Sequence, residues 1–255
     1  MNSRRKLSAV PSTKESREIN MLGYVSKIES LGTVDGPGVR CVIFTSGCPL
    51  RCTYCHNPET WKIGNGEAVD SKEIAEKILR LYPYIKNGGV TFSGGEPCLQ
   101  SEFVFDVISQ IMQTKLHIAL DTSGSILNDS VEKLISICDL IMLDIKFTSE
   151  DEYKMHTGGT LEETLKFLDK CKEFKKEVWV RHVVVPGLND SDEDIVRLAK
   201  LIAPYDNITK IELLPFKKLC LEKYENLGLD FPLYKTPECD AKTIERLYKV
   251  VRDNR

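Results

Sequence analysis

The chain has no hydrophobic run long enough to cross a bilayer, and its N-terminus lacks the apolar core of a secretory signal. It also lacks an excess of charge of one sign, since 35 Lys and Arg oppose 38 Asp and Glu for a formal net charge of −3. That balance provides no overall basic field to hold nucleic acid. We therefore expect a cytoplasmic protein that has neither a membrane nor a nucleic acid as its partner.

The sequence has no fixed-period repeat and no low-complexity linker that would separate domains. Its 255 residues suffice for one substantial core. Residues 1–20 are polar and show little apolar periodicity, so we expect them to form a flexible extension. Residues 21–255 are then predicted to form a single domain.

Short apolar runs alternate with amphipathic stretches along this domain, which predicts an α/β fold. The runs, expected as strands, are 39–45, 89–93, 117–121, 140–144, 178–185 and 210–214. The amphipathic stretches, expected as helices, are 71–81, 101–114, 130–138, 160–174, 191–203 and 241–251. Six strand–helix units predict parallel strands joined by right-handed crossovers. The pattern alone allows either an open partial barrel or a doubly wound sheet.

Nine cysteines in a chain without a secretory signal do not indicate a disulfide scaffold. Three of them, Cys48, Cys52 and Cys55, fall within eight residues just after the first expected strand. Three soft thiolates suit an iron–sulfur cluster or zinc. Structural zinc would need a fourth ligand nearby, whereas three ligands on a four-iron cluster leave one iron open to bind a substrate. The spacing therefore favours a 4Fe–4S cluster.

Two glycine-containing turns accompany the cysteines. The segment 93–97, Ser-Gly-Gly-Glu-Pro, follows the second expected strand, where paired glycines let a ligand approach the backbone. The segment 35–40, Asp-Gly-Pro-Gly-Val-Arg, precedes the cysteines. Each could be an ordinary tight turn when taken alone.

Together these motifs resemble the radical S-adenosylmethionine superfamily, whose signature is Cys-x3-Cys-x2-Cys with an aromatic before the last cysteine. The resemblance implies that Cys48, Cys52 and Cys55 hold the cluster and that its open iron binds the methionyl group of S-adenosylmethionine. One electron then cleaves the cofactor to a 5′-deoxyadenosyl radical. It further implies cofactor contacts from Tyr54, Cys55, His56, Gly94, Gly95, Glu96, Asp144, Ile145, Lys146, Arg181 and Lys217.

Within the superfamily, residues 21–255 resemble the pyruvate formate-lyase activating enzyme family, which has a partial (β/α)6 barrel. The resemblance implies an oxidoreductase of anaerobic metabolism that abstracts a hydrogen from a backbone glycine of pyruvate formate-lyase. Flavodoxin or ferredoxin would donate the electron. The turn in front of the cysteines would bind the glycine-bearing peptide through Asp35, Gly36, Pro37, Gly38 and Arg40. No cysteine lies between Cys55 and Gly94, so we expect a single cluster.

Charged residues at the ends of the expected strands fit this scheme. Glu96, Asp121, Asp144 and Lys146 lie at or just past those ends, where parallel barrels gather functional groups. Two nearby carboxylates would repel each other, so we expect a bound sodium or potassium ion. The resemblance implies its ligands, which are Asp121, Thr122, the Met142 carbonyl and Asp144, with Lys146 as a cationic catalytic group. Lys217 is a departure, because it stands where the family has a histidine.

Two alternatives remain at this stage. One is a radical enzyme that acts on a small molecule, for which the loop from Asp35 to Arg40 would not be expected. The other is a non-catalytic zinc or iron–sulfur module, which the amount and kind of bound metal would distinguish.

Overall fold

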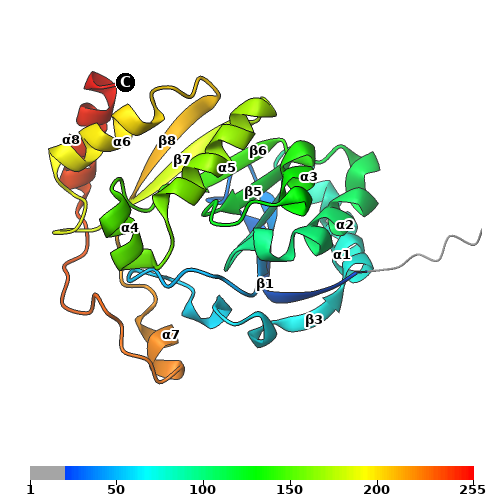
Figure 1. Ribbon diagram of the computed structural model, residues 1–255. Helices are drawn as coiled ribbons and strands as arrows, with labels where there is room; N and C mark the ends of the chain where they lie inside the picture. The colour runs from blue at the N-terminus through cyan, green and yellow to red at the C-terminus, as the bar shows by residue number, and fades with distance from the viewer. Residues whose placement is uncertain (1–20) are drawn as a thin grey trace, which may run out of the picture.

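The computed structural model describes residues 21–255 and shows one eight-stranded sheet flanked by helices (Figure 1). The predicted flexible extension, residues 1–20, lies outside the described residues. The strands are β1 (Leu22–Gly32), β2 (Arg40–Thr45), β3 (Glu67–Asp70), β4 (Gly89–Gly94), β5 (Ile118–Thr122), β6 (Leu140–Asp144), β7 (Glu177–Val184) and β8 (Ile208–Pro215). The α-helices are α1 (Ser71–Ile85), α2 (Ser101–Ile111), α3 (Asp129–Ile137), α4 (Glu150–Thr157), α5 (Leu161–Glu173), α6 (Asp192–Ile202), α7 (Leu221–Asn226) and α8 (Ala241–Asp253). Short 3-10 turns are η1 (Pro58–Thr60), η2 (Ile63–Asn65), η3 (Pro97–Gln100) and η4 (Met112–Thr114).

The strand order is β3-β1-β2-β4-β5-β6-β7-β8. The six strands β2, β4, β5, β6, β7 and β8 pair in parallel. At one edge of the sheet, β1 pairs antiparallel with both β2 and β3. The sheet is open, with β3 at one edge and β8 at the other. The predicted partial barrel of six parallel strands is therefore confirmed, and its antiparallel extension is an addition.

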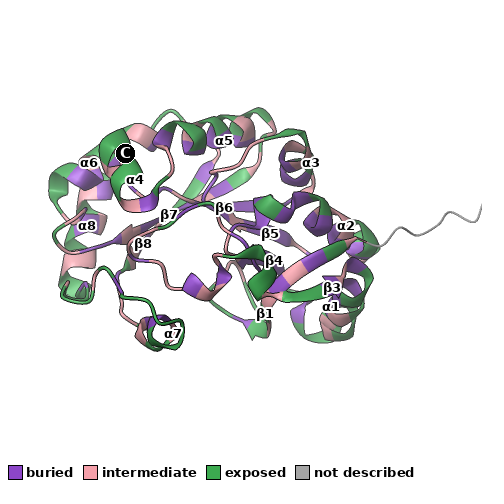
Figure 2. Ribbon diagram, turned by 60° about the horizontal axis from the view of Figure 1, so that its bottom comes forward, coloured by how far each residue is buried: buried purple, intermediate pink, exposed green. Residues whose placement is uncertain are grey.

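Side-chain alternation along the strands separates two apolar regions, as the two-residue period of a strand requires. In β6, Ile141 and Leu143 belong to the large core between sheet and helices, while Leu140 and Met142 pack with Ala119 and Trp179 in a small second cluster. Figure 2 shows the buried residues concentrated on the strands and on the inner sides of the helices. The residue after Met142 on the same side of β6 is Asp144, so this second side ends in a charged group.

Local signals at the helix starts explain why the predicted helices begin where they do. The Asp70 carboxylate accepts a hydrogen bond from the N–H of Lys72 and caps α1. Ser191 and Asp194 form a reciprocal capping box that begins α6. No helix among residues 21–255 is long and apolar enough to span a membrane.

Candidate active site

A cavity of about 330 Å³ opens beside the cysteine segment and the carboxyl ends of the parallel strands. Its size is within the usual range for a small-ligand site. The predicted residues that line it are Asp35, Cys48, Cys52, Tyr54, Cys55, His56, Gly94, Gly95, Asp121, Thr122, Asp144, Lys146 and Arg181. Residues far apart in the sequence thus meet at one place, as the barrel topology predicts.

The cysteine segment leaves β2 and is held at both ends by elements that follow much later in the chain. The N–H groups of Arg51 and Thr53 donate to the carbonyls of Thr157 and His156 at the end of α4. The Nζ atom of Lys223 on α7 donates to Asn57 Oδ1 at 2.7 Å and also pairs with Glu59. The short helices α4 and α7 therefore fix the segment that carries the thiols.

The three thiols on this segment differ from the other six. Cys48, Cys52 and Cys55 are partly accessible, whereas the remaining cysteines are buried. Burial raises the pKa of Cys48 to about 12 and that of Cys52 to about 11. A metal centre would be needed to hold them as thiolates, because metal binding releases the thiol protons.

The donor set bears on which metal centre the site could hold. All three thiols line the same cavity. Three soft thiolates suit an iron–sulfur cluster or zinc, and a structural zinc would require a fourth protein ligand. The donor set therefore fits a 4Fe–4S cluster, which three cysteines can hold.

The turn after β4 brings backbone to the cavity. Gly94 has a φ of 117°, a conformation that favours glycine, and a Cβ there would lie 2.3 Å from the Thr45 carbonyl oxygen. Gly94 and Gly95 both line the cavity. Only a turn without side chains fits this close packing against the end of β2.

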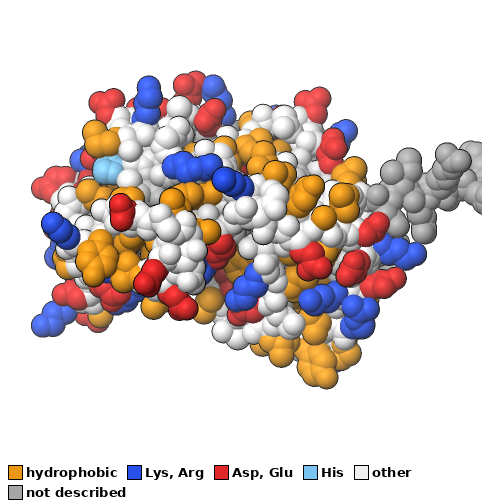
Figure 3. Space-filling model, turned by 90° about the horizontal axis from the view of Figure 1, so that it is seen from below, with side chains coloured by type: hydrophobic (Ala, Val, Ile, Leu, Met, Phe, Trp, Pro, Cys, Tyr) orange, Lys and Arg blue, Asp and Glu red, His pale blue; other side chains and the backbone are white. Residues whose placement is uncertain are grey.

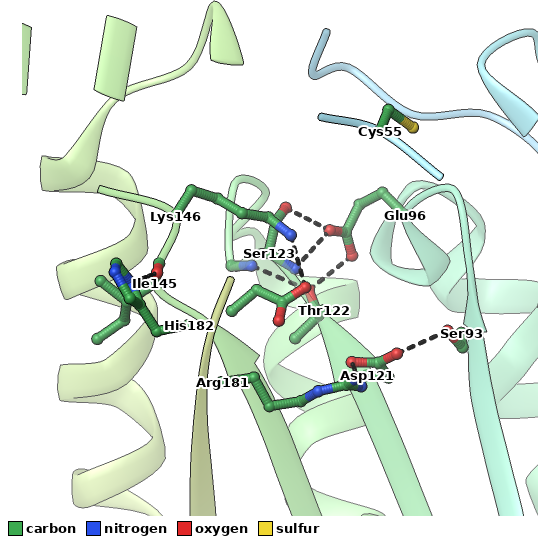
Figure 4. Close-up of polar contacts among 12 residues, drawn as sticks. Cys55, Ser93, Glu96, Asp121, Thr122, Ser123, Ile145, Lys146, Arg181 and His182 are labelled. Atoms are coloured by element: carbon green, nitrogen blue, oxygen red, sulfur yellow. Dashed lines mark hydrogen bonds and ion pairs between the residues drawn. The ribbon is translucent and has the colours of Figure 1, made fainter. Parts of the chain in front are cut away.

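Glu96 is bound by other residues of the protein, and its contact with the cofactor stays a prediction. Its side chain is fully buried, and Figure 4 shows it pointing toward Thr122 and Ser123. The carboxylate accepts hydrogen bonds from the Thr122 hydroxyl at 2.6 Å, from the N–H and hydroxyl of Ser123, and from the N–H of Cys98. Its acceptor capacity is taken up by the protein, so Glu96 joins the β4 turn to the end of β5 and does not line the cavity.

Two ion pairs lie at the cavity floor. Arg181 pairs with Asp121 at 3.0 Å, and the Nζ atom of Lys146 pairs with Asp144 at 2.6 Å. Burial opposes ionisation of Asp144, but Lys146 and Arg181 outweigh it and lower the pKa of this carboxyl. Burial also opposes the charge on Lys146, and Asp144 outweighs it, so the pKa of Lys146 lies well above its usual value. Both members of this pair are therefore charged.

The predicted cation ligands are arranged differently from the expectation. Arg181 and Lys146 already offset the charge of the two carboxylates. The Thr122 hydroxyl donates to Glu96. The repulsion that motivated a cation is thus largely relieved by the chain itself, and the cation stays a prediction.

The loop between β1 and β2 has two functionally distinct ends. Asp35 lines the cavity, and burial together with the nearby Asp121 raises its pKa. Arg40 is fully buried, and its guanidinium donates to the carbonyls of Pro37 at 2.9 Å, Gly88 at 2.6 Å and Val90 at 2.7 Å. Its Nε donates to Thr91. The observed donors of Arg40 anchor this loop, and its contact with a peptide stays a prediction.

The side chain of Lys217 lies away from the cavity, and its contact with the cofactor stays a prediction. Its Nζ atom pairs with Glu238 at 3.2 Å on a partly exposed surface, and Lys217 does not line the cavity. Its carbonyl instead accepts a hydrogen bond from His56 Nε2 at 2.7 Å. The backbone of Lys217 positions a cavity residue, while its side chain turns away.

Two buried polar atoms at the cavity have no hydrogen-bond partner among the described residues. They are the hydroxyl of Tyr54 and Nε of Arg181, and the Nε atom lies 3.9 Å from Glu212 Oε2 in an ion pair. Buried polar atoms are normally satisfied, so the Tyr54 hydroxyl has a donor and an acceptor site left for a ligand. The cofactor contacts of both residues stay predictions.

Several cavity residues had not been predicted, among them Asn57, Trp61, Ser93, Ser123 and Val183. Ser93 donates to Asp121 Oδ2 at 2.7 Å and so orients that carboxylate. The sequence could have predicted Ser93 and Ser123 as cavity residues, since each adjoins a predicted site residue at a strand end. It could not have predicted Trp61, because the place of Trp61 depends on packing against Tyr224 of α7.

Comparison with known families agrees with this geometry. The family described as the Radical SAM superfamily matches residues 42–199, more than half of the chain. Membership of that superfamily implies a 4Fe–4S cluster and S-adenosylmethionine as cofactors. The fold and the site therefore define an enzyme of the radical SAM class.

Curated relatives narrow the class. The chain is 41% identical over 235 residues to the pyruvate formate-lyase-activating enzyme of Clostridium pasteurianum, covering 91% of this chain and 98% of the relative. It is 40% identical over 241 residues to the pyruvate formate-lyase-activating enzyme of Staphylococcus epidermidis, covering 91% of this chain and 96% of the relative. The chain belongs to the pyruvate formate-lyase-activating enzyme family.

Solved structures show the same fold at lower identity. Streptococcus suis SuiB bound to S-adenosylmethionine superposes with a TM-score of 0.66 at 18% identity, covering 83% of this chain and 46% of that chain. A domain of pyruvate-formate lyase-activating enzyme from Bacteroides vulgatus superposes with a TM-score of 0.55 at 23% identity. The match covers 66% of this chain and 94% of that chain.

Proposed function

We propose that this enzyme installs a glycyl radical on pyruvate formate-lyase. The observation that carries the proposal is one cavity that joins three thiols, a glycine turn, two ion pairs and the Asp35 loop. The names of the curated relatives support the identity of the partner. A hydrogen atom would pass from the glycine Cα to C5′ of the 5′-deoxyadenosyl radical, giving 5′-deoxyadenosine and a glycyl radical.

The chain's own residues divide the work of holding the cofactors. Cys48, Cys52 and Cys55 would bind the cluster, which when present supplies the electron that cleaves S-adenosylmethionine. The glycine turn at Gly94 and Gly95 lets the cofactor approach backbone groups. Lys146 and Asp144 present an opposed pair of charges, which suits a ligand that carries both an amino group and a carboxylate.

Arg181 and Tyr54 offer the remaining contacts. The hydroxyl of Tyr54 has no hydrogen-bond partner among the described residues, and Nε of Arg181 has only the ion pair with Glu212 Oε2 at 3.9 Å. Burial of these groups away from water strengthens each hydrogen bond to a ligand. His56, whose ring is held by the Lys217 carbonyl, also lines the cavity.

The loop at Asp35 is the proposed contact for the partner's peptide. Asp35 is the residue of this loop that reaches the cavity, while Gly36 and Gly38 adopt positive φ angles of 121° and 72°. Such a turn leaves backbone groups accessible to a peptide. Arg40 would act indirectly by holding the loop in place.

Three further proposals depend on family resemblance. Flavodoxin or ferredoxin would donate the electron, and the enzyme would act in the cytoplasm. Sodium or potassium bound by Asp121, Thr122, Met142 and Asp144 would require the Arg181 and Lys146 contacts to rearrange. Activity that is unchanged after both ions are removed would argue against the cation.

Reductive cleavage of the cofactor tests the proposed chemistry. The anaerobically reconstituted protein, reduced with dithionite, is expected to convert S-adenosylmethionine to methionine and 5′-deoxyadenosine, measured by chromatography. Pyruvate formate-lyase should accelerate this conversion. Asp35→Asn should keep the slow, uncoupled cleavage and lose the acceleration, because it alters only the proposed peptide contact. No cleavage by the parent protein would refute the proposal.

A further inference from the structure

The backbone of Ile145 is held on both sides by two successive residues of β7. Its N–H donates to the Arg181 carbonyl at 3.0 Å, and its carbonyl accepts from His182 Nδ1 at 2.7 Å. Ile145 directly follows the end of β6 and lies between Asp144 and Lys146, both of which line the cavity. An imidazole thus supplies a hydrogen bond at the point where β6 leaves the sheet (Figure 4).

His182 lies on the opposite side of β7 from Arg181. Strand alternation points Arg181 into the cavity and leaves His182 only 1% exposed. His182 therefore has no access to a ligand in the cavity. Any influence on that ligand must pass through the backbone that it holds.

Asn189, in the loop after β7, determines which ring nitrogen of His182 carries the proton. Asn189 Oδ1 accepts from the Val185 N–H at 2.7 Å, and its Nδ2 donates to the Val183 carbonyl at 2.9 Å. These two backbone contacts fix the orientation of the amide, since an N–H must face an oxygen and a carbonyl must face the amide nitrogen.

With the amide so oriented, its Nδ2 faces His182 Nε2 at 3.2 Å. An amide nitrogen only donates, so Nε2 must be the unprotonated acceptor. The ring proton is then on Nδ1, where it is donated to the Ile145 carbonyl. Burial lowers the pKa of His182, in agreement with a neutral ring.

We propose that His182 and Asn189 are positioning residues that set the backbone of Ile145 and thereby direct Asp144 and Lys146 into the cofactor site. The relay runs from the loop after β7, through Asn189 and a neutral His182 of defined tautomer, to the Ile145 carbonyl. It depends on the proposed function in that Asp144 and Lys146 are taken to contact the cofactor. It assigns no contact with the cofactor to His182 itself.

The ring tautomer can be measured directly. The chain has four histidines, so nitrogen-15 NMR of histidine-labelled full-length protein gives four sets of ring signals, and their comparison with His182→Leu assigns the set that belongs to His182. We expect that set to show a neutral ring protonated at Nδ1. A proton on Nε2, or a ring that is charged near neutral pH, overturns the relay.

The effect on the site is measured by calorimetric binding of S-adenosylmethionine to reconstituted protein. His182→Leu leaves the Ile145 carbonyl without its donor, and we expect binding to weaken by on the order of tenfold at unchanged iron content. His182→Asn places an amide donor close to the Nδ1 position and is expected to recover most of that loss. Recovery by the conservative variant separates positioning from general loss of stability.

Asn207→Leu is the matched control. Asn207 Nδ2 donates to the Lys176 carbonyl at 3.0 Å just before β7, at the other end of the strand. The Asn207→Leu substitution removes a similar side-chain-to-backbone hydrogen bond far from the cavity, so the affinity for S-adenosylmethionine should equal that of the parent protein. If His182→Leu binds the cofactor like this control, the relay is refuted. A parent protein that fails to cleave the cofactor would instead refute the proposed function, and the tautomer would still decide the relay.

Discussion

Accessibility separates the three clustered thiols from the six scattered ones. Cys98, for example, is only 2% exposed and packs in the large core with its Sγ 3.5 Å from the Thr122 hydroxyl. A buried cysteine of this kind behaves as a small hydrophobic residue. Cys48, Cys52 and Cys55 instead line a common cavity, as the proposed ligation of one cluster requires.

Replacement of single cysteines tests this difference. Cys52→Ala leaves two thiols, too few to hold a four-iron cluster, so iron bound after anaerobic reconstitution should fall to near background. Cys98→Ala is the matched control and should bind iron as the parent does, although it should lose some stability by forming a small cavity. A Cys52→Ala protein that keeps full iron and cleaves S-adenosylmethionine would contradict the assignment.

At the scale of residues, motif positions were predictable, but the direction of individual side chains was not. Gly94, Asp121 and Asp144 follow from strand-end positions, and all three line the cavity. Glu96 and Lys217 also lie just past strand ends, but their side chains have other partners. Glu96 accepts hydrogen bonds from Thr122 and Ser123, and Lys217 forms an ion pair with Glu238. Those partners depend on tertiary contacts that the sequence does not encode locally.

At the scale of elements, the buried parallel strands were predicted because their apolar runs are continuous. The antiparallel strands β1 and β3 were missed, since they lie at the sheet edge and are largely exposed or half-buried. The helices α4 and α7 were missed because they are short and bury few residues. These missed helices are the elements that hold the cysteine segment.

The loop from β1 to β2 shows how one buried side chain can organise an element. The Arg40 guanidinium donates to the carbonyls of Pro37, Gly88, Val90 and His117, and burial lowers its pKa to about 10. The loop that carries Asp35 therefore depends on a residue at the start of β2. Removal of that residue should leave several buried carbonyls without a donor.

Arg40→Met is accordingly expected to lower the free energy of unfolding by about 3 kcal/mol or more, measured with urea. Arg80→Met is the control, because Arg80 is exposed on α1 and its pair with Glu76 is 4.0 Å long. Its effect should stay within about 0.5 kcal/mol. A loss of less than about 1 kcal/mol in Arg40→Met would show that Arg40 is not the anchor of this loop.

At the scale of the whole molecule, the sequence left a partial barrel and a doubly wound sheet open. The structure has a second apolar cluster of Ala119, Leu140, Met142 and Trp179 on the side of the sheet away from the main core. Whether a sheet curves around such a cluster depends on how side chains from several strands pack, which a periodic pattern does not specify. The resemblance to a known family supplied that part of the prediction.

The face of the molecule seen from below has charged side chains of both signs (Figure 3). Figure 3 shows acidic, basic and hydrophobic side chains interspersed on the face seen from below, with no broad area of one charge. A phosphate backbone is bound mainly by clustered Lys and Arg.

Electron paramagnetic resonance gives the most direct test of the central claim. The reduced, reconstituted protein is mixed anaerobically with S-adenosylmethionine and pyruvate formate-lyase, and the spectrum is recorded with and without each component. We expect the doublet of a glycyl radical only in the complete mixture, and only with Cys48, Cys52 and Cys55 intact. Formation of 5′-deoxyadenosine in the complete mixture without that doublet would contradict the proposed activity and would indicate a different substrate for the radical.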